Sequence, residues 1–188
     1  MAANGIIVFP TDTVYGLMAA GDPAGATRRL NELKGRDQAT PVAALVNATA
    51  PLLALISDLD EHSPYPLLEL VPGPLTLVIP REFTARVLPS ALMALPHATI
   101  GFRVPSYPPL NALIERAGGW IMATSANPAG RKETATLRST LEGLPQHTID
   151  LAIDGGMLEG IPSAVVEFIN GGWRILRPHP KLPSEPNL

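Results

Sequence analysis

The sequence predicts an α/β protein with an open sheet that mixes parallel and antiparallel strands. Short apolar runs rich in β-branched residues alternate with helical patterns along most of the chain. The last two runs, residues 163–169 and 173–176, flank Asn170-Gly171-Gly172, a good signal for a β-hairpin. Strands that alternate with helices favour parallel pairing, whereas a hairpin pairs its strands antiparallel. Both kinds of pairing are therefore expected in one sheet.

Composition excludes several classes of protein. The 188 residues suit one domain, and the 46% of hydrophobic residues suffice for a full core. The chain has no cysteine, which excludes disulfides, thiolate nucleophiles and cysteine metal sites. A net charge of −3 does not indicate nucleic-acid binding. No apolar run reaches the roughly 18 residues of a membrane span, and the N-terminus lacks the regions of a signal peptide. We therefore expect a cytoplasmic protein with no membrane contact.

The first predicted strand leads directly into a polar loop. Residues 6–9, Ile-Ile-Val-Phe, form the apolar run that a central strand needs, and Pro10 ends it because proline has no N–H for the ladder. Hydroxyl and carboxylate side chains follow at positions 11–15, and Gly16 allows the backbone to turn. Ligands of α/β sheets bind at the carboxyl ends of strands, so a binding loop is one interpretation. An ordinary strand followed by a polar turn is the other.

The first predicted helix has clear signals at both ends. An aspartate at position 22 and a proline at position 23 are typical of an N-cap and the first helical residue. Apolar residues recur with helical spacing, which predicts a helix over 23–34 that stops at Gly35. Lys34 and Arg36 flank this stop, so their side chains can reach whatever lies beside the helix.

The remaining elements follow from shorter patterns that prolines and glycines punctuate. Further strands are predicted at residues 42–46, 75–79, 99–104, 120–123, 151–154, 163–169 and 173–176. Further helices are predicted at residues 52–56, 66–71, 90–94, 110–117 and 137–144. The sequence also predicts an apolar link at 17–20, an acidic turn at 57–61, and a turn that leaves the strand at 124–128. Residues 1–178 are expected to form one domain, and the proline-rich tail 179–188 to be extended or disordered.

Hydroxyl groups and cations gather at the ends of predicted elements. Four cations, Lys34, Arg36, Arg103 and Arg177, lie at such ends instead of on helix faces. The chain has no obvious nucleophile–base pair, and its four histidines are scattered without the spacing of a metal site. Arginine forks and neutral donors suit phosphate and carboxylate groups, so this set favours an anion-binding cleft for phosphoryl or nucleotidyl transfer. The alternative is that each cation pairs with a surface carboxylate and each hydroxyl caps a helix.

Several motifs together resemble the YrdC-like family, the threonylcarbamoyl-AMP synthases. The motifs are Pro10-Thr11-Asp12-Thr13-Val14-Tyr15-Gly16-Leu17, Leu33-Lys34-Gly35-Arg36, Pro72-Gly73-Pro74-Leu75-Thr76, Thr99–Pro105, Thr124-Ser125-Ala126-Asn127, Ser163–Val166 and Ile175–Pro178. They cover nearly the whole chain in the family's order. The resemblance implies a twisted open sheet with flanking helices and a large concave cleft, in the family's short single-domain form.

The resemblance also implies a reaction. Such enzymes join threonine, bicarbonate and ATP into threonylcarbamoyl-adenylate and release pyrophosphate. A separate tRNA threonylcarbamoyl transferase complex then moves the threonylcarbamoyl group to an adenosine in tRNA. Threonine, bicarbonate and ATP are thus the expected ligands, and a weak contact with tRNA is a further expectation.

Residue roles follow position by position from the same resemblance. The residues expected to bind threonine are Thr13, Arg103, Ser125 and Ser163. The residues expected to bind ATP are Lys34, Arg36, Thr40, Thr99, Asn127 and Arg177. Lys34 and Arg36 are the expected catalytic pair. Together with a Mg²⁺ ion, they would balance the charge that develops on the leaving pyrophosphate. The phosphates would hold this ion, so no metal site made of protein side chains is expected.

Three positions depart from the family pattern. Thr40 stands where lysine or asparagine is frequent, so one phosphate contact should be weaker. Leu45 stands where some members place a histidine near threonine, and His179 replaces the usual glycine after Arg-Pro.

Two other functions remain open at this stage. One is a paralogue that uses another carbamoyl or adenylate substrate, as does the related domain of hydrogenase-maturation carbamoyltransferases. Intact Thr13, Ser125, Asn127 and Ser163 count against it. The other is an RNA-binding module, against which the acidic balance counts, because phosphate binding usually needs a surplus of Lys and Arg.

Overall fold

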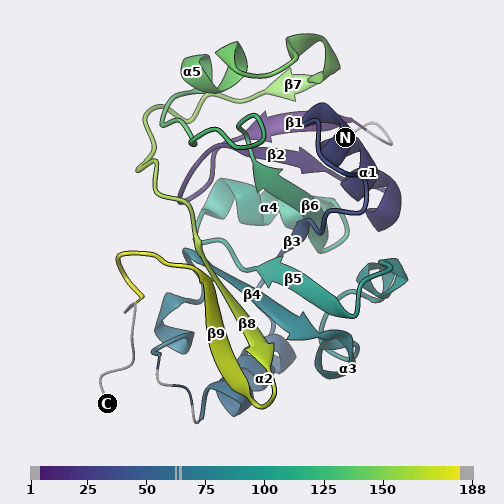
Figure 1. Ribbon diagram of the computed structural model, residues 1–188, viewed down its shortest axis with the longest axis vertical. Coiled ribbons are helices and arrows are strands. Elements are labelled where there is room, and N and C mark those ends of the chain that lie inside the picture. The colour runs from purple at the N-terminus through teal and green to yellow at the C-terminus, as the bar shows by residue number, and fades with distance from the viewer. Residues whose placement is uncertain (1–4, 62, 64, 183–188) are drawn as a thin grey trace.

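One nine-stranded mixed sheet organises the chain (Figure 1). The computed structural model describes residues 5–61, 63 and 65–182. The strands are β1 (Ile6–Phe9), β2 (Gly16–Ala19), β3 (Ala43–Val46), β4 (Leu75–Pro80), β5 (Thr99–Arg103), β6 (Trp120–Ser125), β7 (Leu151–Ala152), β8 (Ala164–Ile169) and β9 (Gly172–Arg177). They lie in the order β7-β1-β2-β6-β3-β5-β4-β8-β9.

The pairing confirms the predicted mixture of strand directions. β1–β7, β3–β5 and β4–β8 are parallel, and the other five neighbouring pairs are antiparallel. The final hairpin is the predicted one, with Ile169 opposite Gly172 and a two-residue turn between them. Asn170 and Gly171 both have positive φ, the conformation that a tight hairpin turn of this kind needs.

Helices cover both faces of the sheet but leave part of one face open. They are α1 (Pro23–Leu33), α2 (Ala50–Asp60), α3 (Arg81–Thr84), α4 (Pro108–Arg116) and α5 (Leu137–Glu142), with 3₁₀ turns at Leu68–Leu70, Ser90–Ala94 and Gln146–Thr148. Within the described residues, no helix has both the length and the apolar character needed to cross a membrane.

The two faces of the sheet carry different layers. On one face, side chains such as Val8, Leu17, Leu77 and Phe102 join α1 and α2 in the main core. On the other face, α4 packs Leu110 and Ile114 on a small set from β1, β2, β3 and β6, namely Ile7, Met18, Leu45 and Ile121. Because α4 covers only this part, the second face stays uncovered toward β5, β4 and β8.

The helix signals around residue 23 are confirmed. Asp22 has extended backbone angles, and its side chain accepts the backbone N–H of Gly25 at 2.7 Å. Pro23 is the first helical residue, and Gly35 follows the helix end with φ of +63°.

Several expectations about boundaries are wrong. Residues 17–20 are not a link: residues 16–19 form β2, which pairs with β1 and β6 and is buried on both faces. The acidic stretch 57–61 is not a turn, because α2 continues to Asp60 and Trp173 Nε1 donates to the carbonyl of Leu59 at 3.0 Å. Strand β6 continues to Ser125, so the turn begins later than predicted.

Three further differences concern short segments. The predicted helix at 66–71 is only a 3₁₀ turn, and the four-residue α3 was not predicted because so short a helix has no periodicity to detect. Residues 179–182 are not extended, since they form a turn that buries Leu182 in the main core. The rest of the predicted tail, residues 183–188, lies outside the described residues, and the proposed domain boundary at 178 stays a prediction.

The segment that connects β7 to β8 is fixed to the loop after β1. The hydroxyl of Tyr15 accepts the N–H of Gly155 at 3.0 Å and lies 2.7 Å from the carbonyl of Gly156. A Cβ atom on Gly155 would lie 2.5 Å from Cβ of Pro10, closer than such atoms ever approach. Only glycine fits at this crossing.

We predict that Gly155→Ala destabilises the protein by about 1–3 kcal/mol, because the added methyl forces the two backbones apart. Gly172→Ala is the matched control, since nothing lies within 4 Å of a Cβ atom there. Urea unfolding of both variants measures the difference. Equal stabilities would contradict the close packing of Gly155 on Pro10.

Candidate functional site

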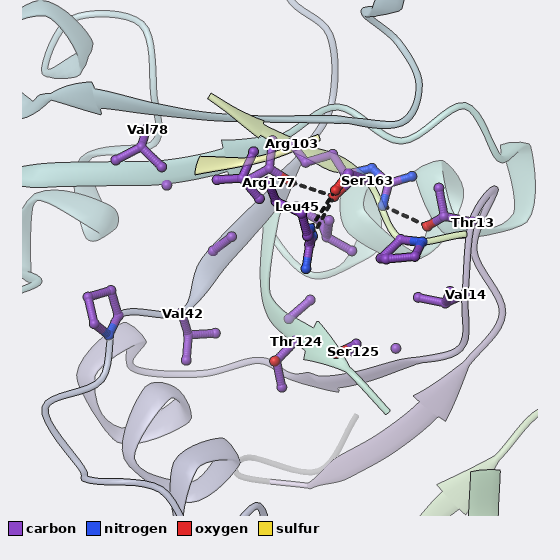
Figure 2. Close-up of a pocket in the computed structure, with 18 of the residues that line it drawn as sticks. Thr13, Val14, Val42, Leu45, Val78, Arg103, Thr124, Ser125, Ser163 and Arg177 are labelled. Carbon is purple, nitrogen blue, oxygen red and sulfur yellow. Dashed lines mark hydrogen bonds between the residues drawn. The ribbon is translucent and has the colours of Figure 1, made fainter. Parts of the chain in front are cut away.

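A cavity of about 460 Å³ lies on the uncovered part of the second sheet face (Figure 2). Most of its wall is made of alternate residues of neighbouring strands, as expected for one face of a pleated sheet. These strand residues are Gly16, Met18, Ala43, Leu45, Thr76, Val78, Thr99, Gly101, Arg103, Ala123, Ser125, Val165 and Glu167. Thr11, Thr13, Arg36, Thr124, Ser163 and Arg177 complete the polar part of the wall.

The floor of the cavity is made of the smallest side chains. Ala43 of β3 pairs with Ala123 of β6, and a Cβ atom placed on Gly101 of β5 would lie 3.6 Å from Cβ of Ala43. Three adjacent strands thus leave a hollow where a ligand can approach the backbone of the sheet.

Arg103 forms the first polar corner of the cavity. It is only 7% exposed, and its Nε donates to the carbonyl of Gly73 at 2.9 Å. Its Nη1 donates to Thr13 Oγ1 at 2.8 Å, and its Nη2 donates to Asp12 Oδ1 at 2.7 Å. Burial lowers the pKa of Arg103, an effect that the carboxylate of Asp12 opposes. The guanidinium is therefore fixed in one orientation.

Arg177 forms the second corner, together with Ser163 and Thr76. Its Nε donates to the carbonyl of Ser163 at 2.7 Å and its Nη2 to Ser163 Oγ at 3.2 Å, while that hydroxyl lies 2.9 Å from Thr76 Oγ1. A bulge in the β8–β9 pairing sets Arg177 opposite Val165 and Ile175 opposite Val166. The bulge turns Arg177 toward the cavity although Ile175, two residues earlier, packs on the core.

The third corner carries Arg36, whose Nη1 lies 3.4 Å from Thr124 Oγ1. Arg36, Arg103 and Arg177 come from three distant segments of the chain and line one cavity. Glu167 also lines it but is paired with Arg174. Three guanidiniums with few opposing carboxylates make this a site for anions.

Lys34 lies behind the cavity wall. It is 5% exposed, and its Nζ donates to the carbonyl of Ser125 at 2.6 Å and to Asn127 Oδ1 at 2.9 Å. Burial, aided by the charge of Arg36 and opposed by that of Glu133, lowers the pKa of Lys34 to about 7. Lys34 is thus a buried amine that holds the end of β6.

The structure brings seven of the ten expected site residues to the cavity. They are Thr13, Arg36, Thr99, Arg103, Ser125, Ser163 and Arg177. Lys34, Thr40 and Asn127 do not line it: Asn127 is 5% exposed beneath Ser125, and the carbonyl of Thr40 accepts the side-chain N–H of Asn31 at 2.8 Å. Their expected ligand roles stay predictions.

Two further residues of the site were not assigned a role from the sequence. Asp12 orients Arg103, and its other oxygen accepts the N–H of Ser106 at 3.2 Å. Thr76 contacts Ser163. Both lie inside motifs that carry the family resemblance, but sequence spacing alone does not reveal which side chain each of them contacts. Within residues 5–61, 63 and 65–182, no group of three or more His, Cys, Asp or Glu side chains could hold a metal ion.

The fold and the cavity define an α/β protein with an arginine-lined cavity on the open face of a mixed sheet. A family profile named Sua5/YciO/YrdC and described as telomere recombination matches residues 1–179. The chain therefore belongs to the Sua5/YciO/YrdC family, which confirms the resemblance found in the sequence.

Similar proteins are threonylcarbamoyl-AMP synthases. The chain is 31% identical to that of Pyrococcus abyssi over 92% of this chain and 50% of the relative, and 30% identical to that of Homo sapiens over 95% and 64%. The chain thus spans about half to two thirds of the length of these relatives. The crystal structure of P. abyssi Sua5 complexed with L-threonine superimposes with a TM-score of 0.73 at 28% identity, over 93% of this chain and 50% of the other. This likeness confirms the predicted fold.

We predict that the buried Lys34 makes stability depend on pH. Between pH 7 and 9 the unfolded chain keeps the lysine proton, whose ordinary pKa is 10.5, whereas the folded protein, with a pKa of about 7, loses it. The unfolded state then binds more protons, so stability rises with pH. Relative to Lys34→Met, the wild type should gain up to about 1.4 kcal/mol of unfolding free energy per pH unit.

Urea unfolding at pH 7, 8 and 9 tests this, because the other titrating groups cancel between wild type and variant. Lys132→Met, at an exposed position, is the control and should follow the wild type. Parallel pH curves for wild type and Lys34→Met would show that Lys34 keeps an ordinary pKa.

Proposed function

We propose that this chain is a threonylcarbamoyl-AMP synthase. It would join threonine, bicarbonate and ATP into threonylcarbamoyl-adenylate and release pyrophosphate. The observation that carries the proposal is one cavity in which three guanidiniums and two hydroxyl-bearing strand ends meet. The names of the relatives and the threonine complex of the P. abyssi protein support it.

The arrangement of donors suits an amino acid and a nucleotide side by side. Arg103 and Arg177 can donate to a carboxylate or phosphate with their remaining N–H groups. Arg36 lies on the opposite wall, beside Thr124, where it can contact a second anionic group. The small residues of the floor, Ala43, Gly101 and Ala123, leave room for a flat group against the sheet.

The reaction needs little covalent help from the protein. The amino nitrogen of threonine forms a bond to the carbon of bicarbonate, which loses water, and gives a carbamate. A carbamate oxygen then attacks the α-phosphorus of ATP, and pyrophosphate leaves with the electrons of the broken P–O bond. Positioning and stabilisation of charge supply most of the rate of such a transfer.

Arg36 and Arg177 would hold the phosphates and stabilise charge on the leaving pyrophosphate. Magnesium would come to the site on the triphosphate and neutralise part of its charge. Since no ready cluster of metal ligands exists among the described residues, we assign the protein no ligand to that ion. The product is a mixed anhydride, and we propose that a tRNA-modifying transferase in the cytoplasm consumes it.

Release of pyrophosphate from ATP, with magnesium and with or without threonine and bicarbonate, tests the function. We predict that release requires both substrates and that Arg103→Ala raises the KM for threonine roughly tenfold or more, because a buried charged donor is lost. Arg103→Lys keeps the charge without the fork and should also be impaired. Arg138→Ala, at an exposed helix position, should behave as the wild type.

Pyrophosphate release from ATP that does not depend on threonine would contradict the proposal. ATP binding without threonine-dependent release would instead favour a relative with a different carbamoyl substrate.

A further inference from the structure

The loop that carries Arg36 is held from behind by one buried residue. Asn31 lies in the last turn of α1, and its exposed fraction is 0%. Its side-chain Nδ2 donates to the carbonyl of Thr40 at 2.8 Å and to the carbonyl of Gln38 at 3.3 Å. Its own backbone carbonyl accepts the N–H of Arg36 at 2.9 Å. Asn31 thus contacts the loop 35–41 near its beginning, its middle and its end.

The direction of the Asn31 amide follows from its partners. Backbone carbonyls can only accept, so the amide nitrogen must face Gln38 and Thr40. The amide oxygen, Oδ1, is buried and has no hydrogen-bond partner in the part of the chain that the structure describes. A buried polar atom without a partner is costly, so stability alone does not explain an asparagine at this position. All the hydrogen bonds that the Asn31 side chain makes go to the loop.

The loop has few other means of keeping its position. Residues 37–41 lie at the surface, and only Thr40 among them is partly buried. The carbonyl of Asp37 accepts the N–H of Thr40 at 3.0 Å, and its Oδ1 accepts the N–H of Ala39 at 2.8 Å. These bonds shape a turn within the loop, and the side chain of Asn31 attaches that turn to α1.

The position of Arg36 depends on its backbone more than on its own side chain. The guanidiniums of Arg103 and Arg177 are fixed by hydrogen bonds as short as 2.7 Å. Among the described residues, the guanidinium of Arg36 makes one hydrogen bond, the 3.4 Å contact of Nη1 with Thr124 Oγ1. A contact of this length holds a side chain weakly. The place of the Arg36 guanidinium in the cavity is therefore determined by the loop, and the loop is held by Asn31.

We propose that Asn31 is a positioning residue that keeps Arg36 where it binds the phosphates of the nucleotide. Asn31 does not line the cavity, so it acts only through the loop. This inference rests on the proposed function and deepens it, because it assigns the placement of a phosphate-binding arginine to a buried amide outside the cavity. Transfer to a phosphate depends on placed charges, and a misplacement of about 1 Å can lower the rate by about a hundredfold.

Loss of the amide should loosen the loop without unfolding the protein. The carbonyls of Gln38 and Thr40 belong to a surface loop and can turn to water when their partner is removed. The unpartnered Oδ1 of Asn31 is lost with the amide. Leucine has the branched shape of asparagine, so Asn31→Leu keeps this position on α1 filled.

The first test measures pyrophosphate release while ATP and threonine are varied in turn. Asn31→Leu should raise the KM for ATP roughly tenfold, which corresponds to the loss of two hydrogen bonds between neutral groups. It should leave the KM for threonine nearly unchanged, because Arg103 and Thr13 are held by other segments. Asn31→Ala removes the same donors with less bulk and should give the same result if the leucine variant fails to fold.

Asn47→Leu is the matched control. The Nδ2 of Asn47 also donates to a backbone carbonyl, that of Asn111 at 3.3 Å, and its Oδ1 also has no partner among the described residues. Asn47 does not line the cavity and lies after β3, away from the loop 35–41. Asn47→Leu should keep both KM values of the wild type.

The second test asks whether Asn31 acts through Arg36. Calorimetric titration with a non-hydrolysable ATP analogue and magnesium compares the wild type, Asn31→Leu, Arg36→Gln and the double variant. If Asn31 only positions Arg36, the double variant should bind as weakly as Arg36→Gln and no more weakly. In an Arg177→Gln background, Asn31→Leu should still weaken binding about tenfold, because Arg36 is present there.

Two results would overturn the proposal. One is an Asn31→Leu protein that unfolds at lower urea concentration but keeps the affinity for the ATP analogue, because this is what a purely structural role produces. The other is a double variant whose loss of affinity equals the product of the two single losses, because Asn31 and Arg36 would then act independently.

The wild type distinguishes failure of this inference from failure of the proposed function. If the wild type binds the ATP analogue but shows no threonine-dependent release of pyrophosphate, the proposed function is wrong, and the double variant still decides the role of Asn31. If the wild type is active and Asn31→Leu keeps its KM for ATP, only the inference is wrong. If the wild type binds no nucleotide, both are wrong.

Discussion

The buried guanidinium of Arg103 is the interaction on which the site depends. A charge at 7% exposure is costly unless it is paired and hydrogen-bonded, and Arg103 meets both conditions through Asp12, Thr13 and the carbonyl of Gly73. These partners come from the loop after β1 and the turn before β4, two segments about sixty residues apart in the chain. Pairing of this one cation therefore joins the two halves of the sheet beside the cavity.

The sheet makes this arrangement possible because it separates stability from binding. One face carries the main core, and the other is covered by α4 only over β1, β2, β3 and β6. Alternation along each strand then sends every second side chain of β5, β4 and β8 into the cavity without any loss to the core. The bulge near Val165 adds Arg177 to this face by breaking the alternation once.

Strands, helices and turns were predicted correctly from the sequence where a local pattern of residues determines them. The first strand, the helix after Asp22 and the final hairpin have strong local signals and are confirmed. β2 was missed because a short strand buried on both faces shows no alternation. α2 was predicted too short because its end is rich in acidic residues, although the helix continues to Asp60 and the carbonyl of Leu59 accepts the Nε1 proton of Trp173. Seven of the ten expected site residues line the cavity. Five of them lie at or beside strand ends, Thr13 lies in the loop between β1 and β2, and Arg36 follows α1. Three features depend on tertiary contacts that the spacing of residues in the sequence does not reveal. They are the burial of the Lys34 side chain, the ion pair of Asp12 with Arg103 and the bulge at Val165.

Groups behind the cavity wall determine how its hydroxyls are oriented. Ser125 Oγ lies 2.5 Å from Asn127 Oδ1, which can only accept, so the hydrogen of Ser125 points to Asn127. Thr13 Oγ1 accepts Nη1 of Arg103, so this hydroxyl and the guanidinium lie in the same corner of the cavity. Lys34 in turn holds Asn127 and the carbonyl of Ser125, and burial lowers the pKa of Lys34 to about 7. The cost of burying Lys34 is thus the cost of fixing the end of β6 beside the cavity.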